Sequence, residues 1–249
     1  RDAVDDLSVS GMESSLLGVA QEYFVRAQES GDQGDYGLAA SKYREYLDKF
    51  PISDDYFEQQ WYLATALRMA GRWDEAADEY TALVRDGRFH PFLDGAMYSR
   101  MDTRLQAMTQ TSGAPDQPPS PATVESVEEL SDGSTLEVYG LSDDRLAFVE
   151  AVDALAAHTF SDSPPLDLPD YAAAYKDNAA ALAYLPAQIY YYHNHYEEAR
   201  RRFFEVVDRY PRTDEASFSA GLILDSFIAE NDLEEVRRWS KAFATRVLG

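Results

Sequence analysis

The sequence repeats itself, and this self-similarity limits the folds open to the chain more than any other feature. At an offset of 160 residues, "FPISDD" (Phe50–Asp55) aligns with "YPRTDE" (Tyr210–Glu215). The alignment at this offset contains no gap. It also pairs Tyr36 with Tyr196, Ala39 with Ala199, Tyr43 with Phe203 and Asp48 with Asp208. Two similar flanks therefore surround a different middle.

A second, shorter period lies inside each flank. "GDYGLAASKYREYL" (34–47) recurs 37 residues later as "GRWDEAADEYTALV" (71–84). "NHYEEARRRFFEVV" (194–207) recurs at the same spacing as "NDLEEVRRWSKAFA" (231–244). Four copies in two tandem pairs predict a repeat architecture, because each unit can bury its apolar face only against its neighbours.

Each copy has the pattern of two helices joined by a tight corner. In every copy, a Gly or Asn that can adopt the left-handed conformation follows an apolar periodic segment. These corner residues are Gly34, Gly71, Asn194 and Asn231. Pro51 and Pro211 are expected to end the second helix of their copies, since proline cannot continue a helix. Ser53 and Thr213, each followed by acidic residues, are expected to cap the next helix.

These motifs resemble a known family. A small residue, an aromatic residue and then a proline eight positions further on, as in "YGLAASKYREYLDKFP" and "YEEARRRFFEVVDRYP", resemble the tetratricopeptide repeat (TPR). The resemblance covers roughly residues 18–88 and 178–248. It implies an all-α fold, an α/α superhelix of helical hairpins, with two tandem repeat pairs and a Pro-rich interruption between them. The "YP-x-[S/T]" ending and "YYYHNHYEEARRRF" look most like bacterial envelope TPR proteins, which include outer-membrane-assembly, cell-division and gliding-motility proteins.

The chain is expected to divide into three parts. N-terminal hairpins occupy 1–110, a Pro/Ser-rich linker with an irregular insert occupies 111–140, and C-terminal helical hairpins occupy 141–249. Within the insert, "VESVEEL" favours a short helix and "SDGSTLEVYG" a small hairpin or extended segment. Apolar spacing predicts helices over 90–110, 141–160 and 171–192. Pro186 predicts a kink or local break in the last of these, near Ala183.

The composition argues against several kinds of partner. The net charge of −23 repels the phosphates of nucleic acid and disfavours an anionic membrane surface. No apolar run is long enough to span a bilayer. The absence of cysteine removes disulfides and Cys-ligated metals. The cations are 18 Arg and 4 Lys, and 26 Asp exceed 19 Glu, which suits either a saline environment or an acidic protein from a GC-rich genome.

The compartment stays open at this point. The chain begins at Arg1 without an initiator Met, so we expect a processed form or an excerpt of a longer precursor. The family resemblance favours a bacterial cell envelope, either the periplasm or an association with the outer membrane, and the cytoplasm remains an alternative.

The resemblance also implies a binding surface. Stacked hairpins of this family leave a concave face, lined by the first helix of each pair, where peptides or partner helices usually dock. Matched residue by residue, the candidate groove consists of Phe24, Gln28, Trp61, Thr65, Arg68, Tyr184, Gln188, Tyr191, Phe218 and Asp225. Aromatic rings with a few polar groups suit an extended peptide or an amphipathic helix. The alternative is that Trp61 and Tyr184 are buried between neighbouring hairpins.

Two further clusters invite a chemical interpretation. His193 and His195 fall at a corner between two helices, where a metal would need more ligands than these two, so we expect a turn and no metal site. The basic run Arg200–Arg202 is expected to pair with nearby carboxylates instead of forming an anion site. The sequence has no Gly-rich phosphate loop, nucleophile elbow or His-Glu-x-x-His helix, so no cofactor and no catalytic residue are predicted.

Three functional hypotheses follow. The first is a non-catalytic adaptor that binds a protein or peptide in a bacterial envelope or motility assembly. The second is a self-associating structural subunit, since "RRWSKAFATRVLG" presents Trp239, Phe243 and Val247 as an apolar stripe that could stack on another chain. The third is a metal-dependent enzyme, for which no motif argues.

Overall fold

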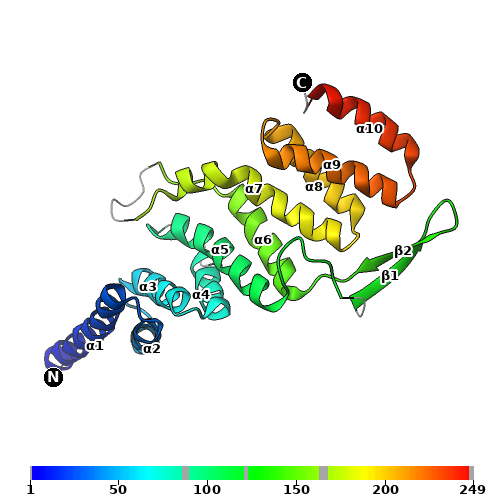
Figure 1. Ribbon diagram of the computed structural model, residues 1–249. Coiled ribbons are helices and arrows are strands. Elements are labelled where there is room, and N and C mark those ends of the chain that lie inside the picture. Colours follow the sequence, from blue (N-terminus) through cyan, green and yellow to red (C-terminus); the bar gives the residue numbers. More distant parts are fainter. Residues whose placement is uncertain (1, 86–89, 121–122, 163–167, 247–249) are drawn as a thin grey trace. The chain divides into compact units, whose positions relative to one another are not determined.

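The computed structural model describes residues 2–85, 90–120, 123–162 and 168–246, and it is mostly helical (Figure 1). The helices in these residues are α1 (Asp2–Ser30), α2 (Gln33–Lys49), α3 (Tyr56–Met69), α4 (Trp73–Arg85), α5 (Leu93–Thr111), α6 (Asp143–Ala157), α7 (Tyr171–Tyr192), α8 (Tyr196–Arg209), α9 (Asp214–Ala229) and α10 (Leu233–Arg246). The strands are β1 (Val124–Glu129) and β2 (Thr135–Tyr139). The predicted architecture of helical hairpin repeats is confirmed.

The chain forms two compact units, which are described separately. Unit 1 consists of Arg1–Ala107 and His158–Tyr171, and unit 2 of Met108–Ala157 and Ala172–Gly249. Each unit therefore contains one of the two tandem repeat pairs, α1–α4 in unit 1 and α7–α10 in unit 2.

In unit 1, α1 packs against α2, α2 against α3 and α3 against α4. Ala39 and Ala76, the small residues of the repeat, are fully buried and let the helix backbones approach closely. The large buried side chains Tyr43, Leu67 and Tyr80 fill the space between the helices. The positions of the repeat that carry small or bulky residues are thus core positions.

Three of the four predicted corners are confirmed. Gly71, Asn194 and Asn231 adopt positive φ angles of 73°, 63° and 57°. After each of them, the next backbone N–H donates to a carbonyl five residues earlier, as in Arg72 N to Leu67 O at 2.9 Å. This is the bonding that closes a helix through a left-handed residue.

The fourth corner prediction is wrong. Gly34 lies in the first turn of α2, and Gly31, with a φ of 69°, follows the end of α1. The reason is local: the Asp32 carboxylate accepts a hydrogen bond from the backbone N–H of Asp35 at 3.0 Å and so begins α2 early.

The predicted helix starts and ends hold in part. Thr213 caps α9, since its hydroxyl accepts from the Ala216 N–H at 3.2 Å. Ser53 does not cap α3, which begins three residues later with Asp55 at the capping position. The second helices α2 and α8 end just before Pro51 and Pro211, as predicted. By contrast, α7 runs through Pro186 as one continuous helix, so the predicted local break is wrong, whereas the alternative of a kink stays a prediction. Pro186 is buried.

The middle of the chain departs from the predicted helix over "VESVEEL". This segment forms β1, which pairs antiparallel with β2 so that Val127 lies opposite Glu137. The turn uses Gly133 at a φ of 82°, and the Asp132 side chain accepts from the Ser134 N–H at 2.9 Å. Leu136 and Val138 of β2 are buried whereas β1 is exposed along its length, so contacts made by β2 hold the hairpin in place. The extended segment predicted over "SDGSTLEVYG" and the helices α5 and α6 are confirmed.

In unit 2, α9 packs between α8 and α10. Phe203, Ile223 and Phe243 are buried there, one from each of these three helices. Their counterparts 160 residues earlier, Tyr43, Leu63 and Leu83, are buried in unit 1, so the two cores use the same repeat positions.

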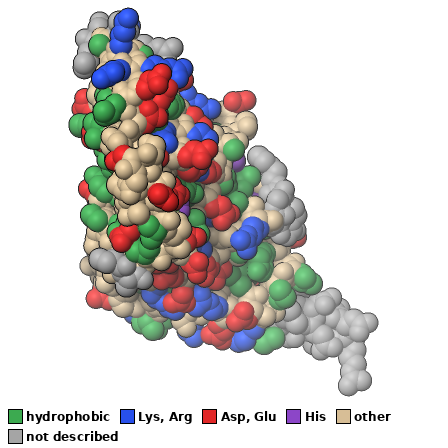
Figure 2. Space-filling view, turned by 90° about the vertical axis from the view of Figure 1, so that its right-hand side faces the viewer, with side chains coloured by type: hydrophobic (Ala, Val, Ile, Leu, Met, Phe, Trp, Pro, Cys, Tyr) green, Lys and Arg blue, Asp and Glu red, His purple; other side chains and the backbone are tan. Residues whose placement is uncertain are grey.

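The surface mixes charges of both signs. On the face drawn in Figure 2, Lys and Arg side chains lie among Asp and Glu side chains. The predicted pairing of the basic run is confirmed: Arg200 contacts Glu230 at 2.6 Å, Arg201 contacts Glu198 at 2.5 Å, and Arg202 contacts Asp153 at 2.8 Å. No helix in the described part of the chain combines the length and apolarity that a membrane crossing requires.

Candidate functional site

Two of the candidate groove residues lie in the core of unit 1. Phe24 on α1 packs edge-on against Tyr36 and Tyr62, with ring centroids 5.8 and 5.5 Å apart. Trp61 on α3 is only 6% exposed. Its ring centroid lies 5.8 Å from that of Phe92. These two aromatic side chains pack within the protein and present little surface to a partner.

The other three candidates in unit 1 are polar. Thr65 shares a hydrogen bond with the Tyr80 hydroxyl at 3.2 Å, and Arg68 forms an ion pair with Asp102 at 3.1 Å. Gln28 is exposed on α1. Two of these side chains are thus already engaged inside unit 1, and a binding role for the set stays a prediction.

The five candidates in unit 2 come together on one surface, here named the α7–α9 face. It consists of Tyr184, Gln188 and Tyr191 from α7 and Phe218 and Asp225 from α9. The Gln188 side-chain amide donates to the Tyr184 hydroxyl at 3.3 Å. The rings of Tyr184 and Phe218 lie 6.4 Å apart, which bridges the two helices.

The α7–α9 face remains open in the described structure. Phe218 is 60% exposed, Asp225 is exposed, and the two tyrosines are half-buried. Between Phe218 and Asp225 lies Gly221, where a Cβ would meet no neighbouring heavy atom of the described residues within 4 Å. A large exposed aromatic side chain beside an uncovered helix backbone is typical of an interaction surface.

The electrostatics of the face combine neutral phenols with carboxylates. Burial, with smaller contributions from Tyr192, Asp116 and Glu215, raises the pKa of Tyr184 to about 12. Burial, together with Tyr196 and Asp225, raises the pKa of Tyr191 to about 12. Both phenols therefore keep their protons near neutral pH and act as donors. The charges around them are negative, which favours a cationic group on the partner.

Sequence reasoning missed two contributors to this face. Asp116 belongs to the Pro-rich segment, and its charge acts on Tyr184 from 68 residues away in sequence, so no spacing rule could have found it. Gly221 carries a signal that was readable, because a glycine inside an otherwise strong helix pattern suggests a close approach or an exposed backbone.

The two histidines at the α7–α8 corner hold the β-hairpin. His193 Nδ1 donates to the Ile189 carbonyl at 2.8 Å, and the His193 carbonyl accepts from the Tyr139 N–H at 3.0 Å. His195 Nε2 donates to the Tyr139 carbonyl at 2.8 Å. The Asn194 side chain donates to the Glu137 carbonyl at 2.7 Å. The predicted turn is confirmed, and its three residues bind β2.

No metal centre emerges from the geometry. Within the described ranges, no group of three or more His, Cys, Asp or Glu side chains is arranged to hold a metal ion. One ring nitrogen of each corner histidine bonds to a backbone carbonyl, as given above, which is an architectural use of the imidazole.

The predicted apolar stripe at the C-terminal end is corrected. Phe243 is buried, and its ring lies 6.2 Å from that of Phe204 on α8. Trp239 is partly buried, with its ring 4.4 Å from that of Phe204. Val247 lies outside the described residues. The repeat packing itself covers Phe243, because α10 returns over α8 and α9.

A family model and several solved structures are similar to this chain. A family model described as tetratricopeptide repeat matches residues 24–91 and 184–226, which supports the TPR family for both flanks. One similar solved structure is a crystal structure of a candidate kinesin light chain from Podosopora anserina with nearly identical TPR-like repeats. Its sequence is 14% identical to this chain, and the two structures superpose with a TM-score of 0.40. The alignment covers 92% of this chain and 93% of that chain. A tetratricopeptide repeat protein from Parabacteroides merdae has 12% identity and a TM-score of 0.30, covering 91% of this chain and 79% of that chain. No curated protein matches the sequence.

Proposed function

We propose, on the premise that both flanks carry tetratricopeptide repeats, that this chain is a non-catalytic scaffold that binds another protein through the α7–α9 face. TPR repeats support a role in protein–protein interaction in general. The observation that carries the specific proposal is that Phe218 is 60% exposed beside half-buried Tyr184, on the first helices of two successive hairpins.

The chemistry of the face specifies the partner segment. Phe218 and the two tyrosines offer aromatic area to an apolar side chain, which is typical of residues that dominate binding energy. Asp225, Asp116 and Glu215 favour an Arg or Lys that lies over a ring or beside a carboxylate. The partner is therefore a peptide or helix that carries apolar and basic residues, and the net charge of −23 disfavours nucleic acid.

For the cellular setting, we propose a bacterial cell envelope or motility assembly, in the periplasm or at the outer membrane. The support is the likeness of "YP-x-[S/T]" and "YYYHNHYEEARRRF" to envelope TPR proteins. Fractionation of the native cells with an antibody against the chain tests this setting. Recovery with the periplasmic or membrane fraction supports it, and recovery with cytoplasmic markers alone contradicts it.

The binding proposal is tested by selecting short peptides from a random displayed library on the purified chain. We expect the selected peptides to be enriched in aromatic or aliphatic residues next to Arg or Lys. Phe218→Ala should weaken their binding by at least about tenfold, since truncating a central aromatic anchor removes about 2 kcal/mol or more of binding energy. Asp225→Asn should weaken only the peptides that carry a basic residue.

A matched control separates the face from general surface apolarity. Leu233 on α10 is 53% exposed and lies outside the α7–α9 face, so Leu233→Ala should leave peptide binding unchanged. Peptides that bind equally well to the wild type and to Phe218→Ala would show that the partner surface lies elsewhere. The circular dichroism spectra of the variants should match that of the wild type, because each substituted side chain is exposed in the folded protein.

A further inference from the structure

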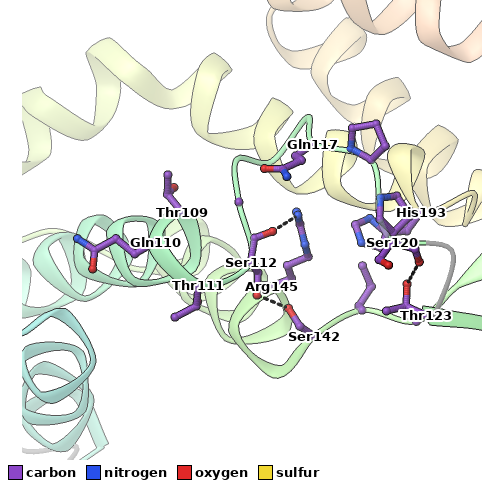
Figure 3. Close-up of a pocket in the computed structure, with 15 residues that line it drawn as sticks. Thr109, Gln110, Thr111, Ser112, Gln117, Ser120, Thr123, Ser142, Arg145 and His193 are labelled. Atoms are coloured by element: carbon purple, nitrogen blue, oxygen red, sulfur yellow. Dashed lines mark hydrogen bonds between the residues drawn. The ribbon is translucent and has the colours of Figure 1, made fainter.

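A pocket of about 830 Å³ lies within unit 2, and none of the five residues that define the α7–α9 face lines it (Figure 3). The end of α5, the segment after it, the start of α6 and His193 form its walls. Its volume is within the range of small-molecule sites. Ser, Thr and Gln side chains make up much of the lining, together with Pro118 and Pro119.

The charge of the lining is opposite to that of the chain. Although 45 of the 249 residues are acidic, none of the 15 residues that line the pocket is. Arg145 and His193 are its titratable side chains among the described residues. Asp144 lies next to the pocket. Its carboxylate accepts hydrogen bonds from the hydroxyls of Thr111 at 2.6 Å and Ser112 at 3.1 Å.

Arg145 is a buried cation that the described residues leave without a carboxylate partner. Arg145 is 3% exposed. Its guanidinium donates hydrogen bonds to two backbone carbonyls, Ser112 O at 2.7 Å and Ala114 O at 3.3 Å. These bonds use two of the five N–H groups of the side chain. Burial lowers the pKa of Arg145 from 12.5, and an arginine remains charged at neutral pH. A buried charge is energetically unfavourable unless a counter-charge lies beside it.

His193 complements this donor with an acceptor. Its Nδ1 bonds to the Ile189 carbonyl, which can only accept, so Nδ1 carries the proton and Nε2 of the neutral ring is an acceptor. Burial lowers the pKa of His193 and keeps the ring neutral. Thr109, Ser120 and Ser142 bring hydroxyl groups to the lining of the same pocket, and a hydroxyl is by its chemistry both a donor and an acceptor.

We propose that this pocket binds a small hydroxylated organic anion. Its carboxylate or phosphate group bonds to the free N–H groups of Arg145, and its hydroxyl groups bond to His193 Nε2 and the lining hydroxyls. A guanidinium suits both kinds of oxyanion, because its planar donors match two acceptor oxygens. This ligand site is additional to the protein-binding function and does not depend on it.

Titration calorimetry with gluconate, glucose 6-phosphate and glucose tests the proposal. Gluconate carries a carboxylate, glucose 6-phosphate carries a phosphate, and glucose is their neutral counterpart. We expect at least one of the two anions to bind and glucose not to bind. Binding of gluconate alone assigns a carboxylate ligand, and binding of glucose 6-phosphate alone assigns a phosphate ligand.

Variants then locate the site without removing the bonds of Arg145. Gln117 is exposed, lines the pocket and lies on the same side as the Arg145 guanidinium (Figure 3). Gln117→Glu preserves the shape of the side chain and adds a negative charge to the pocket. The affinity for the anion should therefore weaken by at least about tenfold. Ser142→Asp adds the same charge at the residue before α6, where Asp is a favourable cap.

Gln21→Glu on α1 of unit 1 is the matched control, because it changes the net charge equally on an exposed surface. Its affinity for the anion should equal that of the wild type. The proposal is overturned if neither anion binds at millimolar concentration, if glucose binds as well as the anions, or if Gln117→Glu and Ser142→Asp both bind like the wild type.

Discussion

The two repeat pairs differ clearly at one matched position. Trp61 on α3 and Gly221 on α9 are 160 residues apart, which is the repeat offset, so they occupy the same place on the same helix of each pair. Trp61 is 6% exposed, whereas no neighbouring heavy atom of the described residues lies within 4 Å of a Cβ built at Gly221. One position is a core position in unit 1 and an open surface in unit 2.

The difference comes from what covers the helix. Over Trp61 lie Phe92 and Tyr171, with ring centroids 5.8 and 6.4 Å from that of the indole. A second matched pair behaves alike: Phe24 is buried in unit 1, while its counterpart Tyr184 is half-buried in unit 2. The repeat therefore determines which side chains face outward from a hairpin, and the neighbouring segment determines whether that face becomes core or stays an open surface.

The strongest test of this comparison is Trp61→Ala. We expect a loss of about 3–5 kcal/mol in the free energy of unfolding, since a buried Trp leaves a cavity when truncated. Urea denaturation followed by circular dichroism measures it. Phe218→Ala, which removes an exposed ring, should change the free energy by less than about 0.5 kcal/mol. A loss below 1 kcal/mol for Trp61→Ala would place the indole on the surface, as the groove hypothesis requires.

Gly95→Ala should produce the next largest effect. A Cβ at Gly95 on α5 would lie 2.6 Å from Trp61 Cη2 and 2.8 Å from Tyr171 Cε2, and neither ring can yield easily. We expect a loss of about 1–3 kcal/mol, which is typical of overpacking. In the Trp61→Ala background the same substitution should lose less stability, because the clash with the indole is gone. Additive losses in the double variant would show that Trp61 and Gly95 do not touch.

Much of the helical architecture was readable in the sequence because it rests on local chemistry. Gly71, Asn194 and Asn231 mark corners through the backbone conformation that they tolerate, and Thr213 marks a cap through its hydroxyl. Gly34 misled the prediction because a second glycine, Gly31, lies three residues earlier and ends α1 instead.

The features that the sequence did not predict depend on distant partners. The β-hairpin is held by the corner residues His193–His195, which lie more than 50 positions away, so "VESVEEL" alone carried no sign of its pairing. The family resemblance implied that Trp61 and Phe218 line the same concave face, but it did not show that only Trp61 is covered. Arg145 shared the apolar stripe of α6 with Phe148, Val149 and Val152, and that signal was overlooked.

Gly221→Ala sharpens the comparison because the same substitution should have the opposite sign from Gly95→Ala. With open space around the position, the added methyl group meets nothing and reduces the conformational freedom of the unfolded chain. We expect a gain of about 0.5–1 kcal/mol in the free energy of unfolding, measured as above. Gly37→Ala on α2 is the control, since Gly37 also has open space, and it should give a similar gain. A loss of stability in Gly221→Ala alone would mean that an unseen contact covers the α7–α9 face.

Gly221→Trp transfers the side chain of unit 1 to the matched position of unit 2, and it should have the smallest effect on stability. Because no neighbouring group occupies the space, the free energy of unfolding should change by less than about 0.5 kcal/mol. The new indole should be quenched by acrylamide as readily as an exposed tryptophan, in contrast to the buried Trp61. Peptides that need Phe218 should bind more weakly, because the indole fills the surface between Phe218 and Asp225. If the variant instead unfolds, the position is covered and the contrast between the two units fails. If it folds and binds such peptides normally, the contrast stands and the partner uses another surface.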